Sequence, residues 1–149
     1  MTNVDRAVAL FEEGYSCSQA VFSAFAPLWG LDQETAVRVA GAFGGGMGRM
    51  GETCGAVTGA LMALGLRHAS TNPQDKEVKE HLYELTRELV ERFKARNDGC
   101  VKCRDLLGVE TSTPEGLQMA RDQELFAKLC PKFVRDAAEI LDQLTDSTQ

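Results

Sequence analysis

The segment from Gly41 to Gly65 constrains the fold of this chain more than any other. It holds nine of the 14 glycines, and no charged residue occurs between Glu52 and Arg67. A helix that is apolar all round is a buried one, and this one is shorter than the roughly 20 residues that span a bilayer. We therefore expect an all-α fold, a compact bundle of about six helices around this central, buried, glycine-rich helix. Its apolar residues fall on every side of the helical wheel: Ala56, Val57, Ala60, Leu61, Met62, Ala63, Leu64 and Leu66.

Apolar residues recur at helical spacing along most of the remaining chain. They predict helices over about residues 4–13, 17–29 and 74–96, a further helix after Asp32, short helical turns after Cys100 and Pro114, and a last helix after Cys130. The sequence shows no strand-like alternation and no tandem repeat. A chain of 149 residues is long enough to bury one core, so we expect a single domain over residues 1–149.

The longest predicted helix, 74–96, carries a narrow apolar stripe. Its members are Val78, Leu82, Leu85, Leu89 and Phe93, each three or four residues from the next. Such a stripe is typical of a coiled-coil seam. We therefore expect a homodimer that packs through this helix.

Charge and composition exclude several classes of partner. The net charge is −6, and no cluster of lysine and arginine occurs, so we expect neither a nucleic acid nor a membrane as partner. The first residues form no basic and apolar leader, which indicates a cytoplasmic protein. The glycine loop lacks the Gly-x-x-x-x-Gly-Lys-Ser/Thr pattern and follows a helix instead of a strand, so we expect no nucleotide.

Several of the five cysteines stand where helices are predicted to begin. Ser16 and Gln19 form a Ser-x-x-Gln capping box, which makes Cys17 the first residue of its helix. Thr53 is the natural cap of the buried helix, which leaves Cys54 at its first position.

The remaining cysteines follow the same pattern. Proline is favoured at the first position of a helix, so Cys130, before Pro131, stands at a predicted cap. Cys100 or Cys103 begins the short turn that follows the longest helix. Helix amino termini stabilise anions and lower thiol pKa values, and the thiolate is the form that attacks disulfides and binds metals. These cysteines are therefore candidates for redox thiols or metal ligands.

The cysteines also fit a role without chemistry. A free cysteine is often only a buried small hydrophobe. Cys100-x-x-Cys103 suggests a dithiol or a metal site, but the strand–helix–strand unit of thioredoxin-like proteins is absent from the sequence pattern, and so are the two close cysteine pairs of the usual zinc site.

The motifs together resemble those of the C_GCAxxG_C_C family of redox-active proteins. The resemblance is carried by Gly14-Tyr-Ser-Cys17-Ser-Gln-Ala-Val21, Phe43-Gly-Gly-Gly46, Gly51-Glu-Thr-Cys54-Gly-Ala56-Val-Thr-Gly59, Cys103-Arg-Asp-Leu-Leu-Gly108, and Cys130 with Phe133 and Val134, over about residues 7–140. It implies a small helical redox protein with four functional cysteines, matched here by Cys17, Cys54, Cys103 and Cys130, with Cys100 as an additional candidate. A related domain of split-Soret cytochromes holds an iron–sulfur centre, but this chain lacks Cys-x-x-Cys-His, so we expect no haem.

Three functions follow from these observations. The first is an electron-transfer protein whose four cysteines converge on an iron–sulfur cluster or another metal, with Gly45, Gly46, Gly51 and Gly55 lining the site and donating amides. The second is a metal-free thiol–disulfide redox protein with one low-pKa cysteine and one resolving cysteine. The third is a non-catalytic helical interaction protein. Either redox function requires an unidentified redox partner protein, and whether the chain is an enzyme stays open.

Overall fold

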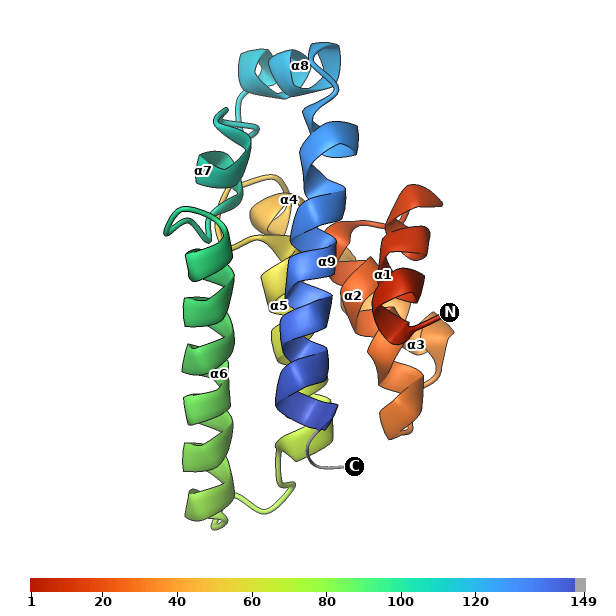
Figure 1. The fold of residues 1–149 in the computed structure, drawn as a ribbon, viewed down its shortest axis with the longest axis vertical. Coiled ribbons are helices and arrows are strands. Elements are labelled where there is room, and N and C mark those ends of the chain that lie inside the picture. The colour runs from red at the N-terminus through yellow and green to blue at the C-terminus, as the bar shows by residue number, and fades with distance from the viewer. Residues whose placement is uncertain (147–149) are drawn as a thin grey trace.

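The computed structural model describes residues 1–146, and these residues form an all-α structure (Figure 1). The prediction of an all-α fold is confirmed. In chain order the helices are α1 (Asn3–Glu12), α2 (Cys17–Phe25), η1 (Ala26–Trp29), α3 (Gln33–Val39), η2 (Gly41–Phe43), α4 (Gly44–Met47), α5 (Gly55–His68), α6 (Lys76–Arg96), α7 (Cys103–Leu107), α8 (Pro114–Asp122) and α9 (Leu125–Asp146). Among the described residues, the only β-type pairing is an isolated antiparallel bridge between Thr53 and Lys102.

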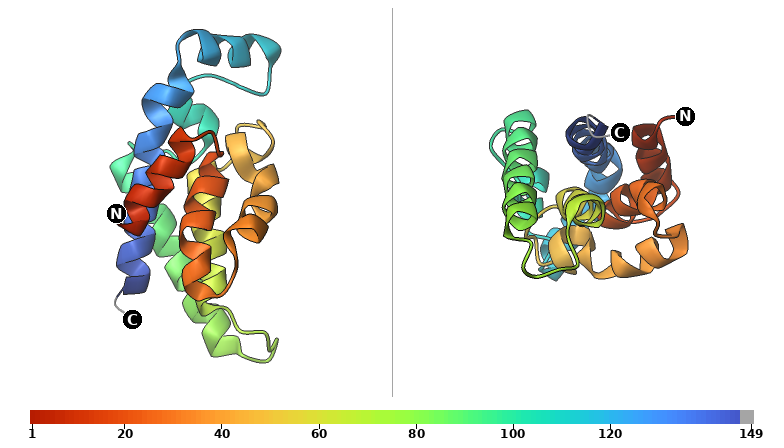
Figure 2. Two further views of the ribbon diagram at one scale, coloured as in Figure 1. Left: turned by 90° about the vertical axis from the view of Figure 1, so that its right-hand side faces the viewer. Right: turned by 90° about the horizontal axis from the view of Figure 1, so that it is seen from below.

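The glycine-rich helix α5 lies at the centre, as predicted. It packs against α2, α6 and α9, and Figures 1 and 2 show α9 covering it, with α6 on one side and α1 with α2 on the other. Two glycines set the contact with α2: a Cβ on Gly59 would lie 2.6 Å from the Ser18 carbonyl oxygen, and one on Gly55 would lie 3.1 Å from the Ser18 nitrogen. Any larger residue at these positions would push the two helices apart.

The apolar stripe of α6 is used within the chain. Leu89 and Phe93 are fully buried, and Leu82 and Leu85 pack against the core at its edge. The helix lies against α5 and α9, and Phe93 contacts Phe133 of α9 with ring centroids 6.4 Å apart. The stripe therefore has partners within its own chain, and the homodimer stays a prediction.

Two predicted helix boundaries are wrong. The last helix begins at Leu125, so Cys130 and Pro131 lie inside α9 and not at its start. Proline offers no N–H to the preceding turn, but the apolar face that follows it continues into the core through Val134 and Ala137, and this packing maintains the helix. At α5 the cap residue is Cys54 itself, because Thr53 is engaged in the bridge to Lys102.

The chain between α3 and α5 has an unusual backbone. Gly45, Gly46, Met47, Gly48 and Arg49 have φ values of 70°, 67°, 64°, 60° and 66°, a run of five left-handed residues. Left-handed backbone costs a non-glycine residue roughly 1–2 kcal/mol, which explains why glycines dominate here. This glycine turn and α7 lie together toward one end of the molecule (Figure 1).

None of the helices in the described part of the chain combines the length and the apolarity that crossing a bilayer demands.

Candidate functional site

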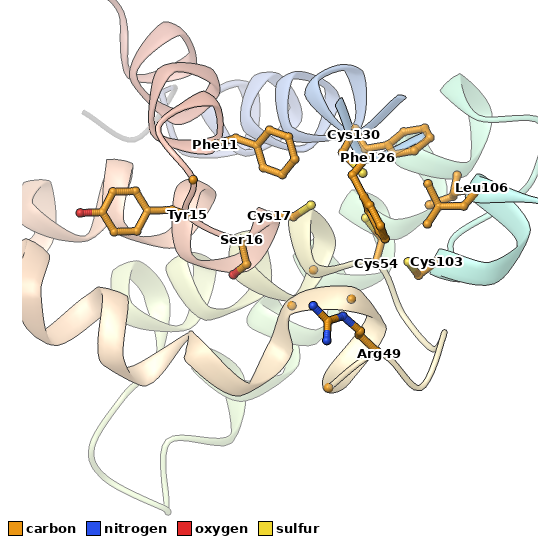
Figure 3. Close-up of a pocket in the computed structure, with 17 residues that line it drawn as sticks. Phe11, Tyr15, Ser16, Cys17, Arg49, Cys54, Cys103, Leu106, Phe126 and Cys130 are labelled. Atoms are coloured by element: carbon orange, nitrogen blue, oxygen red, sulfur yellow. The ribbon is translucent and has the colours of Figure 1, made fainter. Parts of the chain in front are cut away.

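Four cysteines from separate segments line one cavity of about 530 Å³. Cys17 comes from the start of α2, Cys54 from the cap of α5, Cys103 from the start of α7, and Cys130 from the interior of α9. Figure 3 shows the four side chains gathered around the same space. Cys100 does not line this cavity; its sulfur lies 3.8 Å from the Asp98 carbonyl oxygen.

The predicted capping box places Cys17. The Ser16 hydroxyl accepts from the Gln19 amide, and the Gln19 side chain accepts from the Ser16 amide. The same turn is held by Ser18, whose hydroxyl donates to the Ala40 carbonyl oxygen at 2.9 Å. Cys17 therefore stands on a rigid first turn and projects into the cavity.

A short backbone ladder holds Cys54 and Cys103 opposite each other. The Cys54 amide donates to the Val101 carbonyl at 2.8 Å, and the Cys103 amide donates to the Glu52 carbonyl at 2.7 Å. The Glu52 amide in turn donates to the Gly46 carbonyl at 3.0 Å, which joins the glycine turn to the ladder. A small part of the chain thus fixes both cysteines and the turn that faces them.

A polar network around the buried Asp136, six residues beyond Cys130, anchors α9. Asp136 accepts from Lys132 at 2.6 Å and from the Asn97 side chain at 3.2 Å, and it pairs with Arg96 at 3.3 Å. Because Arg96 and Asn97 lie at the end of α6, the network fixes α9 relative to α6. The position of Cys130 is thereby set by contacts outside the cavity.

The four glycines predicted to line the site have different roles. Gly45 and Gly55 line the cavity. Gly46 and Gly51 lie behind it: a Cβ on Gly46 would lie 2.9 Å from the Cys103 Cβ, and one on Gly51 would lie 2.8 Å from a Glu110 carboxylate oxygen. Gly46 and Gly51 therefore allow the close packing that holds the cysteines in place.

Cys17 and Cys54 both line the cavity, and their thiols have pKa values shifted in opposite directions. The neighbouring Cys130 and Cys54 side chains, together with burial, raise the pKa of Cys17 well above its ordinary value. The Cys17 side chain lowers the pKa of Cys54, and so do the nearby amides of Ala56 and Val57, although burial opposes them. The aligned peptide dipoles of α5 act on the Cys54 sulfur in the same direction. The arrangement therefore stabilises the thiolate form of Cys54 relative to that of Cys17.

Cys103 behaves differently from Cys54. Burial and the neighbouring Cys54, Cys130 and Glu110 raise the pKa of Cys103 to about 12. As a free thiol it stays protonated at neutral pH. Several anionic sulfurs can share this cavity only when a cation or a disulfide relieves their repulsion.

The cysteines do not converge tightly enough to hold a single ion. Within residues 1–146, no group of three or more His, Cys, Asp and Glu side chains is arranged to hold one metal ion. Four thiols around one cavity nevertheless have the donor number and softness that iron–sulfur clusters require. A cluster spreads its ligands over several iron atoms, so its sulfurs need not meet at one point.

The chain from residue 15 to residue 144 matches the family described as "Putative redox-active protein (C_GCAxxG_C_C)". The chain belongs to this family. The resemblance inferred from the cysteine and glycine motifs is therefore confirmed, and the family's redox-active description covers residues 15–144. Comparison with curated proteins and with solved structures gives no match.

Two features of the site were not predicted from the motifs. Arg49 and Phe126 line the cavity together with the cysteines (Figure 3). Arg49 belongs to the glycine-rich segment, so its proximity to Cys54 in the sequence is the signal that could have found it. Phe126 lies in the part of α9 that was not predicted to be helical, four residues before Cys130, and the correct helix would have placed both on one face.

Proposed function

We propose that this protein is an electron-transfer protein in which Cys17, Cys54, Cys103 and Cys130 hold an iron–sulfur cluster. The observation that carries the proposal is the convergence of four sulfurs, from four different segments, on one cavity. A thiol–disulfide reaction uses two of them, whereas four thiolate ligands are the usual complement of a cluster. The cluster would supply one-electron oxidation and reduction.

The remainder of the site suits this role. Cys54 is favoured as a thiolate by the amides of Ala56 and Val57. Cys103 and Cys17, whose thiols are neutral in the protein alone, would lose their protons on binding iron, because a coordinated thiol is deprotonated by the metal charge. Phe11, Phe126 and Phe133 cover the cavity with apolar surface, which limits the access of water to the sulfurs.

Iron and sulfide analysis of protein purified without oxygen tests the proposal, together with its visible absorption. Serine at Cys17, Cys54, Cys103 or Cys130 should remove most of the iron and the absorption band. Cys100→Ser is the matched control, because Cys100 lies outside the cavity, and it should keep both. Absence of iron or of sulfide from the wild-type protein would refute the proposal, as would an equal loss in Cys100→Ser.

A second function is favoured by Cys17 and Cys54, which line the same cavity and shift each other's pKa in opposite directions. In this scheme the Cys54 thiolate attacks one sulfur of a partner's disulfide, and the partner's other sulfur leaves as a thiolate. Cys17 then loses its proton and attacks the Cys54 sulfur, which releases the partner's second thiolate and leaves a Cys17–Cys54 disulfide. The partner disulfide gains two electrons and the protein dithiol loses them.

Oxidation of metal-free protein by a small disulfide separates the two functions. The thiol–disulfide function predicts one intramolecular disulfide, assigned by peptide mass spectrometry to Cys17 and Cys54. It also predicts that in Cys17→Ser the reaction stops at the mixed disulfide between Cys54 and the small disulfide's thiol. Random pairing that includes Cys100 would contradict it.

A further inference from the structure

Arg49 differs from the other described residues that line the four-cysteine cavity. It is the only lysine, arginine, histidine, aspartate or glutamate among these lining residues, which are otherwise apolar residues, glycines, cysteines, Ser16 and Tyr15. Figure 3 shows its guanidinium group extending beneath Ser16 and Cys17, away from Cys103. A positive charge thus lies at the edge of a cavity whose walls are mostly carbon and sulfur.

The guanidinium group of Arg49 has no partner within the described residues. In residues 1–146 no carboxylate forms an ion pair with it, and no oxygen accepts a hydrogen bond from it, although the net charge of the chain is −6. The nearby Arg104 provides the contrast, because Glu52 and Glu110 flank it with oxygens 3.7 Å away. An arginine left unpaired in so acidic a chain has its five donors available to a ligand.

The backbone holds Arg49 in this position at a cost. Its φ is +66°, a left-handed conformation that disfavours any residue with a Cβ. Its stem crosses Gly45, where a Cβ would lie 2.9 Å from the Arg49 Cγ. The glycine at 45 therefore provides the space that directs the arginine along the cavity.

We propose that the cavity binds a small organic anion, a molecule with a flat apolar body and a carboxylate or similar group. The anionic group pairs with Arg49, and the body lies between Phe11 and Phe126, next to the sulfurs. The volume of about 530 Å³ falls in the range of small-molecule sites, and such sites combine mostly apolar walls with a few placed polar groups. Binding of this anion does not depend on the function proposed above. Only a reaction of the anion at the cysteine site would rest on that function.

Titration of the 149-residue chain with 2-naphthoate, followed by ¹H–¹⁵N NMR, tests the inference. We expect the amide signals of Cys17, Gly44, Gly45 and Gly48 to shift. Arg49→Gln should weaken binding about fivefold, since one charge-assisted contact is lost at an exposed position. Arg49→Lys should restore most of the affinity, and the neutral 2-naphthalenemethanol should bind Arg49→Gln and wild type equally.

Further variants keep the test decisive. Arg49→Gly suits the left-handed backbone, so it removes the charge without the strain and should weaken naphthoate binding like Arg49→Gln. Arg87→Gln is the charge-matched control, because Arg87 is exposed on α6, which does not contribute to the cavity. Unchanged affinity in both Arg49→Gln and Arg49→Gly, or signal shifts confined to other surfaces, would overturn the inference.

The inference and the proposed function fail in different measurements. Naphthoate binding that depends on Arg49, in a protein without iron, would support the anion site and refute the cluster. A cluster in a protein that does not bind naphthoate would do the reverse.

Discussion

The two ends of α5 are built in different ways. The segments around its amino-terminal end are short and irregular. They include five left-handed residues in succession, an isolated β bridge, and the five-residue helix α7. Around its carboxyl-terminal end the long helices α6 and α9 run regularly beside it. The four cavity cysteines lie at the irregular end. Regular helices supply the burial that stabilises the molecule, and strained backbone is concentrated at the site where it positions side chains.

A substitution in the regular part of α5 should destabilise the protein most, without changing the cysteine cavity. Leu64 is fully buried in α5 and does not line the cysteine cavity. Leu64→Ala should lower the free energy of unfolding by about 3 kcal/mol, because it removes apolar burial and leaves a cavity. Urea denaturation measures this loss. The alkylation rate of Cys54 in the metal-free folded protein should stay as in wild type, and a large change in that rate would show that the two ends are coupled.

A substitution of Gly46 should disturb the irregular end, where the cysteines lie. Gly46 is buried with φ +67°, and a Cβ there would lie 2.6 Å from the Glu52 nitrogen and 2.9 Å from the Cys103 Cβ. Gly46→Ala should cost about 2 kcal/mol in unfolding free energy, from backbone strain and from displacement of the ladder. It should also expose Cys103, so that this thiol reacts faster with a small alkylating reagent.

Gly99→Ala is the control for Gly46→Ala. Gly99 has a similar φ of +81°, but a Cβ there would meet nothing within 4 Å among the described residues. The control should cost about 1 kcal/mol, from conformational strain alone, and should leave Cys103 unchanged. Equal effects of the two substitutions would show that close packing behind the site has no role.

The same contrast explains which features the sequence could predict. The central helix and the capping box at Ser16 depend on neighbouring residues, and both were predicted correctly. The start of α9 and the cap of α5 depend on contacts that are distant in sequence: core packing carries α9 through Pro131, and Lys102 engages Thr53. The left-handed conformation of Met47 and Arg49 was also not predictable, because local preference opposes it and only the surrounding structure imposes it.

The sequence analysis predicted that the cysteines converge on one site, but no local sequence pattern could establish this. Cys17 and Cys130 are 113 residues apart, and only the packing of α2 and α9 on α5 brings them together. The motifs identified the cysteines, whereas their arrangement around one space had to come from the fold. Arg49 shows the same limit, since its lack of an ion-pair partner within residues 1–146 becomes apparent only when the nearby carboxylates have been placed.

The carboxyl-terminal end of α5 carries a titratable residue, His68, whose effect on stability should be small. His68, in the last turn of α5, packs edge-to-face against His81 with ring centroids 5.9 Å apart. Its Nε2 is buried without a hydrogen-bond partner among the described residues. Burial, followed by the charges of Arg67 and His81, lowers the pKa of His68 below its ordinary value. The folded state therefore prefers the neutral ring.

The sign of the pH effect follows from this preference. Above the ordinary histidine pKa of about 6.5 the ring is neutral in both states, and the native stability is fully present. As the pH falls below that value the unfolded chain takes up a proton before the folded one does, so stability is lost toward the lower, folded pKa. The loss should be well under about 1 kcal/mol, since the ring is only partly buried and solvent screens its charge. Urea denaturation at pH 7.5 and pH 5.5 measures it, and His68→Gln should reduce the difference between the two. An equal pH dependence of the unfolding free energy in wild type and variant would show that His68 does not contribute to it.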